Sequence, residues 1–140
     1  MINLNVSFKE IEKKPWQDEI PTDEDSYVMR TAYSLHDKRI INFDAEETRF
    51  ALNQGLHPEF VVWHSLNLLE DNILVETDFY EGSLLITTLR LSHNFWNNNY
   101  DAKVRLISIL EKNISQLEDN DLLLSVKKDI LSAYDDFLNK

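Results

Sequence analysis

Residues 57–72 read HPEFVVWHSLNLLEDN, and the spacing of their apolar side chains indicates a buried helix. At about 100° per residue, one broad face collects Val62, Trp63, Leu66 and Leu69, and Phe60, Val61 and Leu68 widen it. Pro58 suits the first turn of a helix, where a backbone N–H has no partner within the helix. We therefore predict a largely buried helix over residues 57–72.

The same stretch holds two histidines, which raises the question of a metal site. Seven residues separate His57 from His64, a rise of about 10.5 Å along a helix. That is too far for one ion with zinc–nitrogen distances of about 2 Å. No carboxylate or imidazole lies three or four residues from His64. We expect His64 to be a hydrogen-bonded residue at the core boundary, and we predict no metal and no cofactor.

The rest of the chain also favours a mainly α fold. Only two glycines and three prolines occur among 140 residues, whereas sheet proteins need many turns, which favour these residues. Further helices are predicted over residues 26–39, 42–56, 83–98, 100–117 and 119–140. In 42–56, Asp44 and Glu47 have the spacing of a capping box and Gly55 marks the end. We predict one domain, 1–140, built as a bundle of about five to six helices.

Two segments leave α+β as the alternative fold. Residues 2–8 (INLNVSF) alternate like a short edge strand, and residues 73–90 could form a hairpin, because LLITT is rich in β-branched residues. Otherwise we expect Ser83 to cap a helix over 83–98. Residues 1–25 are the least regular part, with a loop at 13–25 that Trp16 and Ile20 anchor to the core.

Composition and charge exclude several classes of function. Cysteine is absent, which rules out thiolate chemistry, and no apolar run approaches the roughly 18 residues of a membrane span. Asp and Glu number 25 against 14 Lys and Arg, a net charge of −11. Nucleic-acid binders need the opposite balance. We expect a cytoplasmic protein that binds neither nucleic acid nor membrane.

Catalytic motifs are missing too. The sequence contains no glycine-rich phosphate loop, no GxSxG and no HExxH. His93 lies beside Phe95 and Trp96, where a packed helix end is favoured over an aromatic ligand pocket. We therefore predict that the protein is not an enzyme.

The distribution of charge points to one segment. Residues 57–98 hold six acids and one base, a local charge of −5, whereas residues 99–140 hold eight acids and six bases, only −2. The segment EDNILVETDFYE, 70–81, holds five of the acids and two aromatic residues. Acids steer a protein toward basic partners, and an exposed tyrosine can anchor an interface. We predict a partner-binding site made of Glu70, Asp71, Glu76, Asp78, Phe79, Tyr80 and Glu81. The alternative is a solvated loop whose aromatic rings turn inward.

A small, acidic, cysteine-free chain with the segment WHSLNLLEDNILVETDFYEGSLLITTLRLSHNFW, 63–96, resembles the immunity proteins of bacterial toxin systems. It is similar in type to those of contact-dependent growth inhibition. The resemblance implies stoichiometric binding to a cognate toxin domain, often a basic nuclease. It implies neutralisation by covering the active site or by blocking it from a second surface.

Two other functions stay open at this point. One is a regulatory or adaptor domain with a non-toxin partner. The other is a small metal-dependent enzyme that combines His57, His64 or His93 with distant acids.

Overall fold

The computed structural model describes residues 2–13, 22, 26–118 and 124–139, and within these ranges it contains nine α-helices and no strand longer than a single bridge. The α-helices are α1 (Phe8–Glu12), α2 (Tyr27–His36), α3 (Ala45–Asn53), α4 (Pro58–Asp71), α5 (Ser83–Leu89), α6 (His93–Asn98), α7 (Tyr100–Lys112), α8 (Ile114–Leu117) and α9 (Leu124–Leu138). A 3₁₀ turn, Ile40–Asn42, precedes α3. The predicted mainly α class is confirmed.

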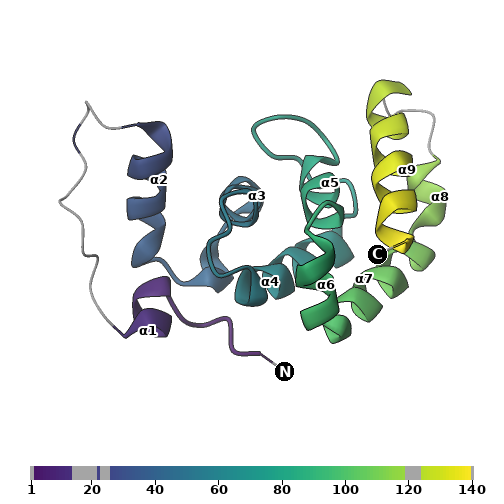
Figure 1. Cartoon of the computed structure of the whole chain (residues 1–140). Coiled ribbons are helices and arrows are strands. Elements are labelled where there is room, and N and C mark those ends of the chain that lie inside the picture. The colour runs from purple at the N-terminus through teal and green to yellow at the C-terminus, as the bar shows by residue number, and fades with distance from the viewer. Residues whose placement is uncertain (1, 14–21, 23–25, 119–123, 140) are drawn as a thin grey trace.

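Helix α4 lies at the centre of the fold and packs against α3, α5 and α7. Val62, Leu66 and Leu69 are fully buried along it, as the periodicity predicts. Trp63 is only half-buried, so the helix buries a narrower face than we expected. Figure 1 shows α4 and α7 along the lower side of the molecule, with α3, α5 and α9 above them.

Both alternative β segments are absent from the described chain. Residues 83–89 form α5, and six of those seven residues are buried. Thr88 fits a helix because its hydroxyl donates to the Leu84 carbonyl and shares a hydrogen bond with Ser65 on α4. Burial against α3, α4 and α9 thus outweighs the β-propensity of LLITT.

The N-terminal segment is extended but makes no strand. Ile40 N–H donates to the Val6 carbonyl and Ile41 N–H to the Leu4 carbonyl, at 2.8 and 3.0 Å. The pairing stops there because the partner segment turns into the 3₁₀ helix. A helix that we did not predict follows: Ser7 and Glu10 form a capping box that starts α1. The predicted anchors Trp16 and Ile20 lie outside the described residues.

Two predicted helices are broken, which raises the number of helices above five to six. The segment 83–98 divides into α5 and α6, and Ser92 caps α6 by accepting from Phe95 N–H. Gly82, not Ser83, occupies the position before α5. It has a positive φ of 91°, and a Cβ there would lie 3.1 Å from a methyl carbon of Ile130 on α9.

The segment 100–117 divides into α7 and α8 at Asn113, and its buried face differs from the predicted one. The 3–4 spacing of the apolar residues in 100–117 predicts a core face made of Val104, Ile107, Leu110, Ile114 and Leu117, yet Val104 and Ile114 are 46% and 41% exposed. Leu110, which belongs to the predicted face, is fully buried, and so is Leu106, which does not. The helical spacing of apolar residues in 119–140 predicts that Ile130 and Phe137 face the core, and both are buried on α9. The Phe137 ring meets that of Trp96 edge-on, with centroids 5.2 Å apart.

Candidate functional site

Five of the seven predicted site residues lie together on one loop between α4 and α5. We call residues 76–81 the acidic loop; it joins Glu76, Asp78, Phe79, Tyr80 and Glu81. Glu76 and Glu81 form an antiparallel bridge at its base. The three carboxylate residues are exposed, and the Phe79 and Tyr80 side chains are 64% and 40% exposed. The rings therefore point outward, contrary to the alternative that they turn into the core.

The other two residues, Glu70 and Asp71, are at the end of α4. Arg105 on α7 donates from Nη2 to a Glu70 carboxylate oxygen at 2.7 Å and to the Asn67 side chain at 2.7 Å. The hydrogen bond from Arg105 lowers the pKa of Glu70. The charge of Glu70 is thus already paired within the chain. Asp71 is exposed.

The carboxylates of the acidic loop differ from Glu70 in this respect. Among the ion pairs between described residues, none involves Glu76, Asp78 or Glu81. Three negative charges within six residues leave a surface that can receive cations. The loop has the chemistry of a docking site for a basic surface, with two aromatic rings among the acids.

Helix α3 supports the acidic loop through two residues that the sequence analysis did not identify. Glu46 accepts hydrogen bonds from Arg49 Nε and Nη2 at 2.9 and 2.6 Å, and from the Asp78 backbone N–H at 3.3 Å. The Arg49 guanidinium carbon lies 4.1 Å from the centroid of the Phe79 ring. The i, i+3 spacing of Glu46 and Arg49 predicts their mutual pair. Nothing in the sequence links that pair to a loop about thirty residues away.

The ends of the acidic loop are also held. Thr77 and Ser83 hydroxyls share a hydrogen bond, and Ile73 and Leu74 just before the loop are buried. Figure 1 shows the loop rising at the top of the view, between α3 and α5. The loop is therefore an exposed segment with fixed ends.

The histidines lie elsewhere. His64 Nε2 is 2.8 Å from the Phe43 carbonyl, so the predicted hydrogen bond is confirmed, although the residue is buried and not at the boundary. His36 and His57 both approach Glu12 beside a cavity of about 320 Å³. His93 is exposed at the start of α6. Within the described ranges, no group of three or more His, Asp or Glu residues is arranged to hold a metal ion.

A second hollow lies beside α4. It has a volume of about 780 Å³, and its lining combines the apolar Ile2, Leu4, Ile41 and Trp63 with the polar Asn3, Asn5, Asn67 and Arg105. The half-buried Trp63 thus faces this groove. None of the helices in the described part of the chain combines the length and apolarity that a bilayer crossing requires.

Comparisons with known proteins give one match. The family model described as CDI immunity proteins matches residues 10–106, which include α2 to α6, most of α7 and the whole acidic loop. No curated protein and no solved structure matches the chain. The family match covers more than half of the 140 residues. The chain therefore belongs to the family of CDI immunity proteins, as the resemblance predicted.

Proposed function

We propose that this chain neutralises a basic toxin domain by stoichiometric binding, and that the acidic loop is the surface that meets it. Membership of the immunity family implies neutralisation of a cognate toxin by binding. The finer proposal rests on one observation: two exposed aromatic rings lie among three exposed carboxylates with no ion pair to described residues. Glu70 and Asp71 would flank this surface. No step of the proposed function requires catalysis by this chain.

The chemistry of the acidic loop suits a partner rich in Lys and Arg, such as a nuclease that holds a phosphate backbone. Carboxylates on an exposed loop accelerate encounter with such a surface. Phe79 and Tyr80 supply apolar area that can fill a pocket or stack on a guanidinium. Charge would then act mainly on the association rate, and the rings on the dissociation rate.

The test is a charge reversal of the acidic loop, Glu76→Lys with Asp78→Lys and Glu81→Lys. The probe is the cognate toxin domain, identified by its co-purification with the tagged chain, and its binding kinetics are measured at low and high salt. We expect association to slow by at least about tenfold at low salt, with the salt dependence of the wild-type rate lost. The rings are tested by Phe79→Ala and Tyr80→Ala, each expected to weaken binding by about thirtyfold if it is an anchor.

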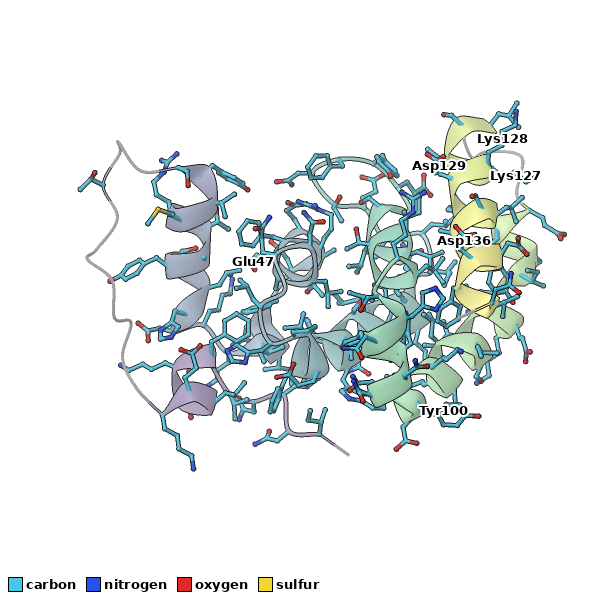
Figure 2. The ribbon with its side chains drawn as sticks, in the orientation of Figure 1. Glu47, Tyr100, Lys127, Lys128, Asp129 and Asp136 are labelled. Atoms are coloured by element: carbon cyan, nitrogen blue, oxygen red, sulfur yellow. The ribbon has the colours of Figure 1, made fainter. Side chains whose placement is uncertain are left out.

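A matched control makes the same change of charge elsewhere. Asp101 and Glu111 are exposed on α7 and Asp136 on α9, and Figure 2 shows Asp136 on α9. Their joint replacement by Lys should leave association within about twofold. Equal slowing by both triple variants would show that only net charge matters. Unchanged binding of the loop variant would exclude the acidic loop as the site.

A further inference from the structure

We propose that Glu46 and Arg49 on α3 are positioning residues, which hold the acidic loop in the conformation that the toxin domain recognises. This inference rests on the proposed function for its biological meaning. Its structural part, that α3 orders the loop, stands on contacts within the free protein. The two parts can therefore fail separately.

The first contact is made by the Glu46 carboxylate. Its two oxygens accept from Arg49 Nε and Nη2, in the two-pronged geometry that arginine and carboxylate favour. The oxygen that faces Nε also accepts the Asp78 N–H, in the middle of the acidic loop. Both side chains are largely buried, with Glu46 14% and Arg49 12% exposed. Water competes little for the bonds between Glu46 and Arg49, so the pair offers a fixed acceptor to the Asp78 N–H, whose own bond lies at the exposed surface.

The state of charge of Glu46 agrees with this role. The hydrogen bonds from Arg49 lower the pKa of Glu46 more than burial raises it, and the Asp78 N–H lowers it further. The carboxylate is therefore ionised at neutral pH and remains an acceptor for both partners.

The second contact is made by the Arg49 guanidinium, which lies against the Phe79 ring at 4.1 Å. Such a stack attracts because the cation meets the negative face of the ring. One face of the ring is thereby occupied, yet the side chain remains 64% exposed. Arg49 thus presents Phe79 to solvent in one orientation, with a free face for a partner's side chain.

These contacts matter because the acidic loop without them is expected to sample many conformations. Its three carboxylates repel each other, and its aromatic rings make few contacts with the core. A loop that samples many conformations binds with an affinity reduced by the fraction of time it spends in the competent one. Anchoring by Glu46 and Arg49 raises that fraction without touching the partner.

The test uses three variants of the full chain. Arg49→Met removes the positive charge and the two N–H donors but keeps much of the side-chain volume. Arg49→Lys keeps the charge but loses the two-pronged hydrogen-bond geometry. The charge-swapped pair Glu46→Arg with Arg49→Glu keeps an i, i+3 ion pair on α3 but leaves no carboxylate at position 46 for the Asp78 N–H. Circular dichroism establishes that each variant is folded.

The first readout needs no partner. We expect the amides of Asp78 and Phe79 to exchange hydrogen faster in Arg49→Met and in the swapped pair, while amides in α4 and α7 keep their wild-type rates. Unchanged exchange at Asp78 and Phe79 would overturn the inference, whatever happens in binding.

The second readout is the kinetics with the toxin domain named above. We expect affinity to fall on the order of tenfold in Arg49→Met and in the swapped pair, and less in Arg49→Lys. In a Phe79→Ala background the effect of Arg49→Met should shrink, because the ring that Arg49 orients is gone. Wild-type kinetics in all three variants would refute the positioning role.

Lys38→Met is the matched control. Lys38 Nζ donates to both carboxylate oxygens of Glu47 at 2.8 and 2.9 Å, so the variant also removes an ion pair made to α3. Figure 2 shows Glu47 on the side of α3 that faces α2, away from the acidic loop. Wild-type exchange and kinetics in this control are expected; an equal loss would mean that any weakening of α3 suffices. If the triple variant Glu76→Lys, Asp78→Lys, Glu81→Lys binds the toxin domain normally, the proposed site is wrong, while the hydrogen-exchange result still stands.

Discussion

The carboxylate of Glu12 lies 2.8 Å from Nε2 of His57 and 3.3 Å from Nε2 of His36. One side chain thus joins the last residue of α1 to the residues that end α2 and precede α4. His57 adopts a positive φ of 43°, which is uncommon for a residue with a side chain, and its ring contacts Phe8 as well as Glu12. These contacts fasten the N-terminal helices to the central helix.

Removing this carboxylate should therefore loosen the N-terminal part of the fold. We expect Glu12→Ala to lower the free energy of unfolding by about 0.5–1.5 kcal/mol, since its bonds are only partly shielded from water. Urea denaturation followed by circular dichroism measures the change. Glu111→Ala on the exposed face of α7 is the control, and an equal loss there would deny Glu12 any special role.

Stability should fall on the acid side of neutrality. Hydrogen bonds from Arg49 and Arg105 lower the pKa values of Glu46 and Glu70. For Glu12, burial raises the pKa but the hydrogen bonds from His57 and His36 outweigh it, and the net pKa lies below the ordinary value of 4.5.

A lowered pKa means that the unfolded chain takes up these protons at a higher pH than the folded protein. The contribution is complete above the ordinary glutamate value of 4.5 and is lost as the pH falls through the folded values. We expect urea midpoints to drop between about pH 5 and about pH 3, and to drop less steeply in Glu46→Gln. A midpoint independent of pH across this interval would contradict the assignment.

The start of α3 depends on its cap. The Asp44 side chain accepts a hydrogen bond from the Glu47 N–H at 2.7 Å, and the Glu47 side chain accepts one from the Asp44 N–H at 2.9 Å. We expect Asp44→Ala to destabilise the protein by about 1 kcal/mol and Asp44→Ser to cost much less. Thermal unfolding of the two variants provides the comparison. Equal losses would mean that the cap hydrogen bond contributes nothing. Because α3 carries Glu46 and Arg49, hydrogen exchange in the acidic loop should also rise in Asp44→Ala.

The buried face of α7 can be tested with two residues. Leu106→Ala should cost about 2–5 kcal/mol, because Leu106 is fully buried. Val104→Ala should change stability by no more than about 0.5 kcal/mol, because Val104 is 46% exposed. Chemical denaturation measures both. A larger loss in Val104→Ala than in Leu106→Ala would mean that the core face predicted from the sequence, which includes Val104, is the correct one.

Local signals along the chain were sufficient for several elements. The 57–72 helix was predictable because its apolar residues recur every three or four positions and Pro58 opens it. The beginning of α3 was predictable because Asp44 and Glu47 have capping-box spacing. The composition, poor in Gly and Pro, indicated the helical class. The immunity resemblance drew on the same acidic and aromatic character of residues 63–96.

Other features needed contacts between distant segments. The hairpin alternative for 73–90 failed because residues 83–89 are surrounded by α3, α4 and α9, and burial there outweighs local β-propensity. The helix breaks at Ser92 and Asn113 separate α5 from α6 and α7 from α8. The side of α7 that packs against α4 buries Leu106 and leaves Val104 exposed. Periodicity reports which residues share a face, but it does not report where a helix ends against its neighbours.

The predicted binding segment shows the same division. The gathering of acidic and aromatic residues between positions 70 and 81 is visible in the sequence, because composition is a local property. The ion pair of Glu70 with Arg105 and the position of Phe79 on Arg49 arise from the tertiary fold. Both outcomes depend on arginines that lie 35 and 30 residues away along the chain. The physical reason is that a charge or a ring acquires its role from its neighbours in space.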